Sequence, residues 1–145
     1  MSDANKNVRL LYQLGNSLVK LRNRKAEAFG LTSVQMDVVA FLLKNRDKDE
    51  INQLDVQKYL ALSHPAVTGI IRRTEEKGFL RREQSSRDAR YNCLHLTEKA
   101  LELEDVLDHD AAEVEKIVMK NMSAAEQEEF HRLLLLAMDN IRSTE

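Results

Sequence analysis

Tryptophan is absent from this 145-residue chain, and aromatic residues make up only 5% of it. This scarcity leaves no platform of rings on which the bases of single-stranded nucleic acid would stack. The one cysteine, Cys93, excludes a disulfide framework and fits a reducing cytoplasm. The chain also has a single proline and four glycines. Because so few residues interrupt regular structure, helices should dominate the fold.

The sequence also lacks a signal peptide, a lipidation signal and any apolar run long enough to span a bilayer. We therefore expect a soluble protein of the cytoplasm that has no membrane partner. No phosphate-binding loop, ordered Ser-His-Asp set or paired-carboxylate motif stands out, so we expect neither an enzyme nor a cofactor. His109 and Glu113 share a predicted helix face close to Asp110, but no cysteine or second histidine stands at ligand spacing. We interpret this group as a solvated acidic face and expect no metal site.

The charges of the chain are segregated, although its net charge is only −2. Residues 63–97 contain seven Arg and Lys against four acidic residues, a net charge of +3. Residues 98–145 contain five against thirteen, a net charge of −8. A negative total argues against a nucleic-acid partner, but one basic patch is what the phosphate backbone requires. The acidic end should point away from that patch.

Residues 63–77 have the pattern of a helix with two contrasting faces. Ser63 is a favourable N-cap, Pro65 is tolerated in the first turn, and Gly78 suits the left-handed position that ends a helix. The apolar face consists of Val67, Ile70 and Ile71. The second face is slim, polar and basic, and it consists of His64, Thr68 and Arg72 flanked by Pro65, Gly69 and Arg73. A glycine inside a helix costs stability, so Gly69 indicates close approach by something large.

A hairpin follows this helix. Residues 79–83 and 91–96 are typical of two strands, and residues 85–90 form a tip that contains Arg87 and Arg90. An α-helix fits the major groove of double-stranded DNA, and an extended basic tip can enter the narrower minor groove. A solvated charged helix followed by an ordinary surface hairpin would have the same local pattern. The flanking segments favour the DNA interpretation.

Start signals define the other helices. Capping boxes at Thr32–Gln35 and Asn52–Asp55 predict helices over residues 32–45 and 52–60, and a short turn then leads to Ser63. Two short helices joined in this way form a helix-turn-helix. A capping box at residues 123–126 begins the last helix. Before it, Thr97 begins one helix whose apolar stripe is Ala100, Leu103, Leu107, Ala111, Val114 and Val118.

The first and last helices carry apolar seams. Along residues 7–29 the seam is Leu11, Leu14, Leu18 and Leu21, and in the last helix it is Phe130, Leu133, Leu134, Ala137, Met138 and Ile141. The first seam either covers the core or packs against a partner chain. The helix exceeds the mean length of about twelve residues, which favours a partner chain. We therefore expect a homodimer.

The order of these motifs resembles the MarR family of transcription regulators. The segments that carry the resemblance are LTSVQ, PAVTGIIRRTEEKGFLRR and SSRDARYNCLHLTEKA, and it extends over about residues 7–142. It implies a mainly α winged helix-turn-helix with a two-stranded β wing between N- and C-terminal dimerisation helices. The implied parts are a dimerisation helix at residues 1–30, a DNA-binding domain at 31–97 and dimerisation helices at 98–145. Family members are dimers that usually repress promoters.

The resemblance also assigns roles to individual residues. Arg90 would enter the minor groove, Asp88 would brace it by a carboxylate–guanidinium bond, and Arg87 would contact a phosphate. The major groove would be faced by Ser63, His64, Pro65, Ala66, Thr68, Gly69, Arg72 and Arg73. The chain departs from the usual family residues at Gln57, Ala61, Thr74 and Ala100, none of which removes a DNA contact.

The function we expect is sequence-specific binding to a near-palindromic operator in double-stranded DNA, as a repressor that responds to a ligand. The alternative is a winged-helix protein-interaction module that does not bind DNA. The basic face and the pair formed by Asp88 and Arg90 favour the first function. Family resemblance also implies a small aromatic or anionic effector.

Two further groups have both a plain and a functional interpretation. Cys93 lies in the second strand, whereas redox-sensing family members carry their reactive cysteine near the N-terminus, so we interpret Cys93 as a packed structural thiol. Tyr12, Met36, Phe41 and Tyr59 could line a ligand cleft, but residues at helical spacing are more often core. The sequence therefore assigns no cofactor-binding or effector-binding residue.

Overall fold

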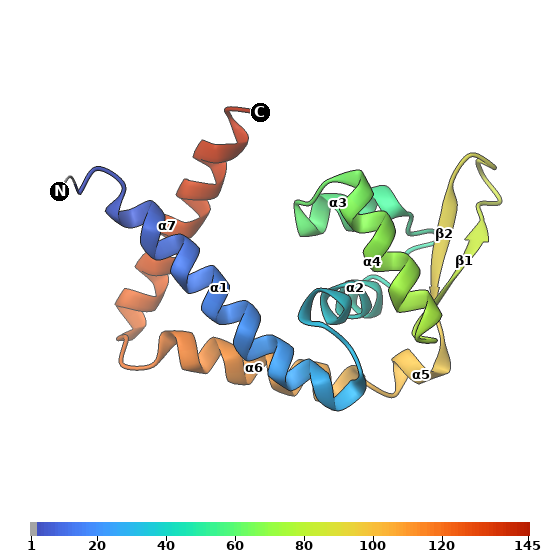
Figure 1. The fold of residues 1–145 in the computed structure, drawn as a ribbon, viewed down its shortest axis with the longest axis horizontal. Coiled ribbons are helices and arrows are strands. Elements are labelled where there is room, and N and C mark those ends of the chain that lie inside the picture. Colours follow the sequence, from blue (N-terminus) through green and yellow to red (C-terminus); the bar gives the residue numbers. More distant parts are fainter. Residues whose placement is uncertain (1–2) are drawn as a thin grey trace. The chain divides into compact units, whose positions relative to one another are not determined.

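The computed structural model describes residues 3–145, which form a mainly helical fold with one two-stranded antiparallel sheet (Figure 1). The predicted fold class is thereby confirmed. The elements in chain order are α1 (Lys6–Ala26), the 3₁₀-helix η1 (Glu27–Phe29), α2 (Ser33–Lys44), α3 (Gln53–Leu60), α4 (His64–Glu76), β1 (Leu80–Gln84), β2 (Asn92–Leu96), α5 (Glu98–Leu101), α6 (Glu104–Met119) and α7 (Ala124–Arg142). The chain divides within α6 into two compact units, one that extends to Asp110 and one over Ala111–Glu145.

Side-chain caps begin the helices where the sequence predicts them. Thr32 and Gln35 close a complete capping box at α2, and Asn52 and Asp55 do the same at α3. A third box, formed by Ser123 with Glu126, begins α7. Each box satisfies backbone N–H groups that have no partner inside the helix. The predicted helix starts are therefore confirmed.

The core of the first unit has two apolar clusters that share α2. One joins α2, α3, α4 and the sheet through fully buried side chains such as Val38, Val56, Val67 and Ile71. The other joins the end of α1, α2 and the segment after the sheet, and it contains Ala26, Leu31, Met36, Val39, Leu43, Phe79, Ala100 and Leu107. The apolar face predicted for residues 63–77 is confirmed, because Val67, Ile70 and Ile71 are all buried.

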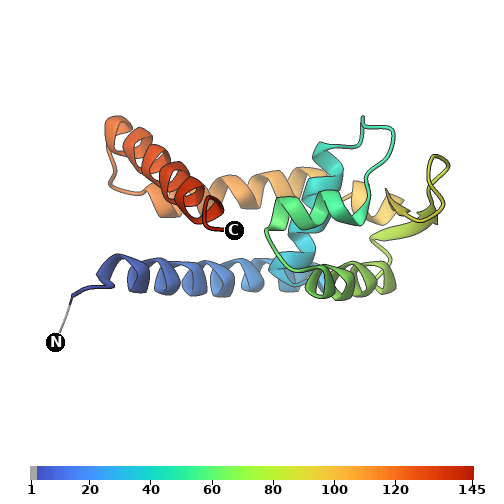
Figure 2. The same cartoon turned by 90° about the horizontal axis from the view of Figure 1, so that it is seen from above.

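The hairpin is anchored to the helical core at its base. Leu80 pairs with Leu96 and Gln84 pairs with Asn92 at the two ends of the ladder. Leu80 and Leu94 are buried in the first cluster, and the Leu94 N–H donates to the Ile51 carbonyl at 2.8 Å. Figure 2 shows the hairpin at the end of the unit that is remote from the N-terminal part of α1. The ladder therefore fixes the base of the hairpin, and all of the tip (residues 85–90) except the buried Ser85 lies outside the core.

The helix predicted to begin at Thr97 is interrupted, which corrects the expectation of one continuous helix. α5 ends at Leu101 and α6 begins at Glu104. At the break, the Leu103 N–H donates to the Ala100 carbonyl three residues earlier, at 3.0 Å. Ala100 on α5 and Leu107 on α6 are both buried in the cluster that contains Phe79. The apolar stripe therefore continues across the break between α5 and α6.

α1 and α7 expose long apolar faces. Ala26 is the one buried residue of α1, and α7 has none. Exposed apolar side chains are Val8, Leu10, Leu11, Tyr12, Leu14 and Val19 on α1, and Leu133, Leu134, Leu135, Leu136, Met138 and Ile141 on α7. Within residues 3–145 no single helix has the length and hydropathy needed to cross a membrane. The segments Lys6–Phe29 and Ser33–Lys44 reach that length and hydropathy only when taken together, and they are bent by 73° where they meet. Apolar area of this extent on a small chain is typical of a protein–protein interface.

Candidate nucleic-acid interface

The polar face of α4 is exposed along its length, as the sequence predicts. Ser63 is the N-cap, and its Oγ accepts a hydrogen bond from the Ala66 N–H at 3.4 Å. His64, Pro65, Ala66, Thr68, Arg72 and Arg73 are exposed, and Gly69 is half-buried. Because Val67, Ile70 and Ile71 hold the opposite face in the core, the helix presents this surface in a fixed orientation. Its diameter suits the major groove of B-form DNA.

Polar side chains of α3 support the exposed face of α4. Gln53 donates through Nε2 to Thr68 Oγ1 at 2.6 Å and lies 3.3 Å from His64 Nδ1. Gln57 places its Oε1 3.3 Å from the same histidine nitrogen. The Thr68 hydroxyl in turn donates to the His64 carbonyl at 2.9 Å. Helix α3 therefore orients the side chains of His64 and Thr68 in the first turns of α4.

Ala61 makes the turn between these helices with a left-handed backbone, at φ 54° and ψ 42°. A residue with a Cβ is strained in this region, and glycine is not. The departure from the family pattern noted at Ala61 is thus a local conformational cost. Gln57 is compatible with the turn, because its side chain is directed at His64.

Gly69 has no side chain, and the guanidinium group of Arg73 lies close to it. A Cβ at this position would lie 3.3 Å from Arg73 Nη2. The Arg73 side chain therefore folds along the helix over Gly69. In this structure the group that approaches Gly69 is part of the same helix.

The wing tip carries the predicted pair of Asp88 and Arg90. Arg90 donates from Nε and Nη2 to the Asp88 carboxylate at 3.0 and 2.7 Å, and its backbone N–H donates to the same carboxylate at 3.1 Å. The Arg90 side chain is 81% exposed. Its hydrogen bond lowers the pKa of Asp88, and the carboxylate raises the pKa of Arg90. The predicted brace is present, and it holds an exposed cation at the tip.

Two carboxylates of the loop between α2 and α3 contact the same tip. Asp49 forms an ion pair with Arg87 at 2.6 Å, and both side chains are exposed. Glu50 accepts hydrogen bonds from Ser85 Oγ at 2.7 Å, from the Ser86 N–H at 3.2 Å and from Ser86 Oγ at 3.0 Å. The Ser85 hydroxyl lowers the pKa of Glu50. Arg87, predicted as a phosphate contact, is therefore paired within the chain.

Glu75 joins the end of α4 to the hairpin. Its carboxylate accepts from the Arg82 backbone N–H at 2.7 Å and from Arg82 Nε at 2.9 Å. The backbone hydrogen bond, followed by the Arg82 side chain, lowers the pKa of Glu75. This contact fixes the start of the wing relative to α4, so the helix and the wing form one surface.

Cys93 is buried, with 4% of its surface exposed, and its backbone bridges to Asn52. Burial raises the pKa of the Cys93 thiol, which keeps it protonated near neutral pH. The interpretation of Cys93 as a packed structural thiol fits these observations.

The residues considered for a ligand cleft lie in different environments. Met36 is buried as expected for core, and Phe41 is half-buried and stacks on Tyr59 with ring centroids 4.7 Å apart. The plain core interpretation is wrong for Tyr12 and Tyr59, which are 72% and 54% exposed. The four side chains do not gather around one cavity among the pockets described for residues 3–145.

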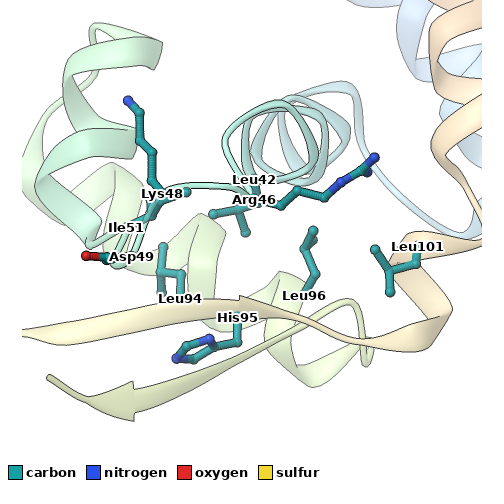
Figure 3. Close-up of a pocket in the computed structure, with 9 residues that line it drawn as sticks. All are labelled: Leu42, Arg46, Lys48, Asp49, Ile51, Leu94, His95, Leu96 and Leu101. Carbon is teal, nitrogen blue, oxygen red and sulfur yellow. The ribbon is translucent and has the colours of Figure 1, made fainter. Parts of the chain in front are cut away.

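A small pocket of about 160 Å³ lies between β2, α5 and the loop after α2. Its apolar lining consists of Leu42, Ile51, Leu94, Leu96 and Leu101. Figure 3 shows Lys48 directed away from these side chains and His95 on the opposite side of β2, while Arg46 forms an ion pair with Glu104 at 2.7 Å. The pocket thus offers apolar contacts but no converging set of polar groups.

Sequence reasoning missed three residues that shape the interface: Asp49, Glu50 and Gln53. All three are polar residues next to the start of α3, where the Asn52–Asp55 box explains the polarity locally. For Gln53, the one indication in the sequence is that it lies only ten residues before Ser63, so that α3 and α4 are adjacent helices. For Asp49 and Glu50 the partners lie more than thirty residues away, and no local pattern indicates them.

A polar, basic helix face supported by a preceding helix, beside a hairpin with a braced arginine, defines the winged helix-turn-helix class of DNA-binding proteins. A family model described as MarR family matches residues 29–90. This match, together with the transcriptional regulators and solved structures that the chain is similar to, supports a MarR-family winged-helix regulator and so confirms the resemblance seen in the sequence.

Individual relatives agree with this assignment. The transcriptional activatory protein BadR of Rhodopseudomonas palustris is 32% identical over 97 residues, which cover 67% of this chain and 55% of BadR. The chain therefore spans about half the length of that relative. The transcription regulator MarR from Oenococcus oeni PSU-1 is 26% identical, with a TM-score of 0.76 over 90% of this chain and 97% of that one. The S. aureus MepR–DNA complex has a TM-score of 0.85 at 21% identity over 97% of this chain and 99% of that one, which shows a shared fold.

Proposed function

We propose that this protein binds double-stranded DNA as a homodimer and regulates transcription from a near-palindromic operator in the cytoplasm. The observation that carries this proposal is the exposed face of α4 beside the wing on which Asp88 orients Arg90. α4 enters the major groove, and Arg90 enters the adjacent minor groove, where a narrow groove concentrates negative potential. The DNA complex of MepR, which shares the fold, supports the choice of partner.

The dimer is built by the exposed apolar faces of residues 1–30 and 98–145, and residues 31–97 form the DNA-binding domain. Those faces bury their leucines against a second copy of the chain, which also supplies the second recognition helix. Two-fold symmetry then requires two half-sites about one helical turn apart, roughly 34 Å. Repression follows if the operator overlaps a promoter, whereas the relative BadR is named an activatory protein. A small aromatic or anionic effector would control binding.

The test is selection of bound fragments from genomic DNA by the full-length protein, followed by gel-shift titration of the recovered sites at fixed salt. We expect a near-palindrome with half-sites one turn apart and at least tenfold preference over unrelated duplex, because specific binding exceeds non-specific binding by large factors. A reporter driven by a recovered site then distinguishes repression from activation. A dimer that retains no duplex DNA would contradict the proposal and favour the interaction-module alternative.

A further inference from the structure

We infer that Glu50 is a positioning residue for the wing, and that Asp49 beside it opposes DNA binding by holding Arg87. This inference rests on the proposed function. It assigns opposite effects on DNA binding to two adjacent carboxylates. Both belong to the loop between α2 and α3, and both reach a hairpin tip more than thirty residues later in the chain. Neither residue lies on the exposed face of α4.

Glu50 begins a continuous chain of hydrogen bonds that ends at Arg90. Its carboxylate accepts three hydrogen bonds from Ser85 and Ser86. Ser85 Oγ accepts from the backbone N–H groups of Arg87 at 3.1 Å and Asp88 at 3.2 Å. The Asp88 carboxylate then holds the Arg90 guanidinium. The position of the exposed arginine is thereby set from a loop that belongs to the helical core.

The chemistry of Ser85 requires an acceptor at Glu50. A serine hydroxyl has one hydrogen to donate and two lone pairs to accept with. Ser85 donates its hydrogen to Glu50, and both lone pairs are engaged by the N–H groups of Arg87 and Asp88. Ser85 is also buried, with 9% of its surface exposed. Glutamine would keep only one acceptor oxygen, so its amide nitrogen would lie either against Ser85 Oγ, whose lone pairs are engaged, or against the Ser86 backbone N–H, which is itself a donor.

Asp49 acts on the same tip in the other direction. Its carboxylate forms an ion pair with Arg87, a residue whose backbone N–H donates to Ser85 Oγ. A DNA phosphate that contacts Arg87 must replace Asp49, so the ion pair competes with binding. Removal of Asp49 therefore frees one cation for the phosphate backbone.

Glu50→Gln and Asp49→Asn form a matched pair for the test. Each removes one negative charge at adjacent positions near the DNA, so through-space electrostatics alone would tighten binding in both. We expect Glu50→Gln to bind a fixed duplex of about 30 base pairs roughly three- to tenfold more weakly, a smaller loss than that from Arg90→Ala. Asp49→Asn should bind as tightly as the parent or more tightly. Tighter binding by Glu50→Gln would overturn the positioning role.

The salt dependence of binding provides a second readout that a general loss of stability would not give. Each phosphate contact contributes about 0.9 to the slope of log affinity against log salt concentration. The magnitude of the slope should decrease for Glu50→Gln, because the wing loses its contacts with DNA. For Asp49→Asn the magnitude should increase by roughly 0.9, the contribution of one phosphate contact. A slope for Asp49→Asn equal to the parent's would refute the competition at Arg87.

Hydrogen exchange in the DNA-free protein tests the hydrogen bonds between Glu50 and the wing tip independently of DNA binding. The amides of Ser86, Arg87 and Asp88 should exchange faster in Glu50→Gln and in Ser85→Ala, and at the parental rate in Asp49→Asn. Unchanged protection in both Glu50→Gln and Ser85→Ala would overturn the inference. If the parent itself binds no duplex, the proposed function fails while the exchange result still decides whether Glu50 positions the tip.

Discussion

Gln53 of α3 donates a hydrogen bond to Thr68 of α4, between Nε2 and Oγ1 at 2.6 Å. Thr68 Oγ1 also donates to the His64 carbonyl, so the hydroxyl hydrogen is committed to its own helix. Thr68 therefore has its methyl group and one oxygen lone pair, but no hydroxyl hydrogen, left for another partner. A threonine methyl in the major groove matches the methyl group of thymine.

This relationship predicts that two substitutions of Thr68 will have different effects on operator affinity. Thr68→Val keeps the methyl and the branched shape but loses the hydrogen bond from Gln53. Because buried Val67 and Ile71 still hold α4 in place, operator affinity should change less than threefold. Thr68→Ser keeps the hydroxyl and loses the methyl, and binding should weaken by roughly five- to tenfold at sites with a thymine in register, at the lower end of the cost of a lost base contact. Titration of both variants against one operator decides the point. The reverse order would show that the hydroxyl reads the DNA.

Arg90→Ala should weaken operator binding by roughly five- to 150-fold, the range expected when one directed arginine contact is lost. The fold should be unaffected, because the side chain is 81% exposed and its contacts are confined to the tip. Asp88→Ala should weaken binding less, because Asp88 only orients Arg90. Fluorescence anisotropy at fixed salt gives the affinities, and the thermal midpoint provides the control. Parental affinity in Arg90→Ala would refute the wing assignment.

Leu11→Glu should convert the dimer into monomers or aggregates. Leu11 is 50% exposed in the single chain and belongs to the seam that we assign to the dimer interface. A buried unpaired carboxylate at an apolar interface is strongly unfavourable. Gln13→Glu adds the same charge at a nearby exposed position outside the leucine seam and should remain dimeric. Sedimentation velocity measures both, and a dimeric Leu11→Glu would exclude this seam from the interface.

Ala61→Gly should raise the free energy of unfolding by up to about 1 kcal/mol, because glycine relieves the left-handed strain at φ 54° but has more backbone entropy to lose. Ala66→Gly is the matched control, because Ala66 is an exposed alanine with helical backbone in α4. That change should lower the free energy by about 0.5–1 kcal/mol. Denaturant unfolding at one protein concentration compares the two. A destabilised Ala61→Gly would contradict the strain at the turn.

Cys93 should not act as a redox switch. Its thiol is buried and its pKa is raised by that burial, so little reactive thiolate forms at neutral pH. Mild peroxide should leave operator affinity unchanged, and Cys93→Ser should behave like the parent. A disulfide-exchange reagent should react slowly with the native protein and rapidly after unfolding. Loss of binding on oxidation that a thiol reverses would show that Cys93 is a sensor.

Features that depend on a few neighbouring residues could be predicted from the sequence. The boxes at Thr32–Gln35 and Asn52–Asp55 join residues three apart, so their spacing alone identifies them. The pair formed by Asp88 and Arg90, which the family resemblance implies, spans two residues and is also local. Such features have the same geometry in any fold that contains the helix or the turn.

Other features depend on packing between distant segments. The break between α5 and α6 is absent from the apolar periodicity of residues 98–118, although Ala100 and Leu107 on its two sides are buried in the same cluster as Phe79. The exposure of Tyr59 likewise reflects its place on the outer side of α3, where it stacks on Phe41. A periodic pattern gives the face of a helix but not the element that covers it.

By itself, the sequence determined most of the helices, the hairpin and the exposed face of α4, because each is encoded by short spacings, and it showed the family resemblance through motifs in a fixed order. Tertiary structure alone decided that Glu50 would hold Ser86 across 36 residues and that Gln53 would hold Thr68 across fifteen. These contacts require two loops or helices to be brought together by the burial of side chains such as Val56, Val67 and Leu94. The hydrophobic core therefore places the polar groups that orient the wing and the recognition helix, and no local pattern in the chain specifies those pairings.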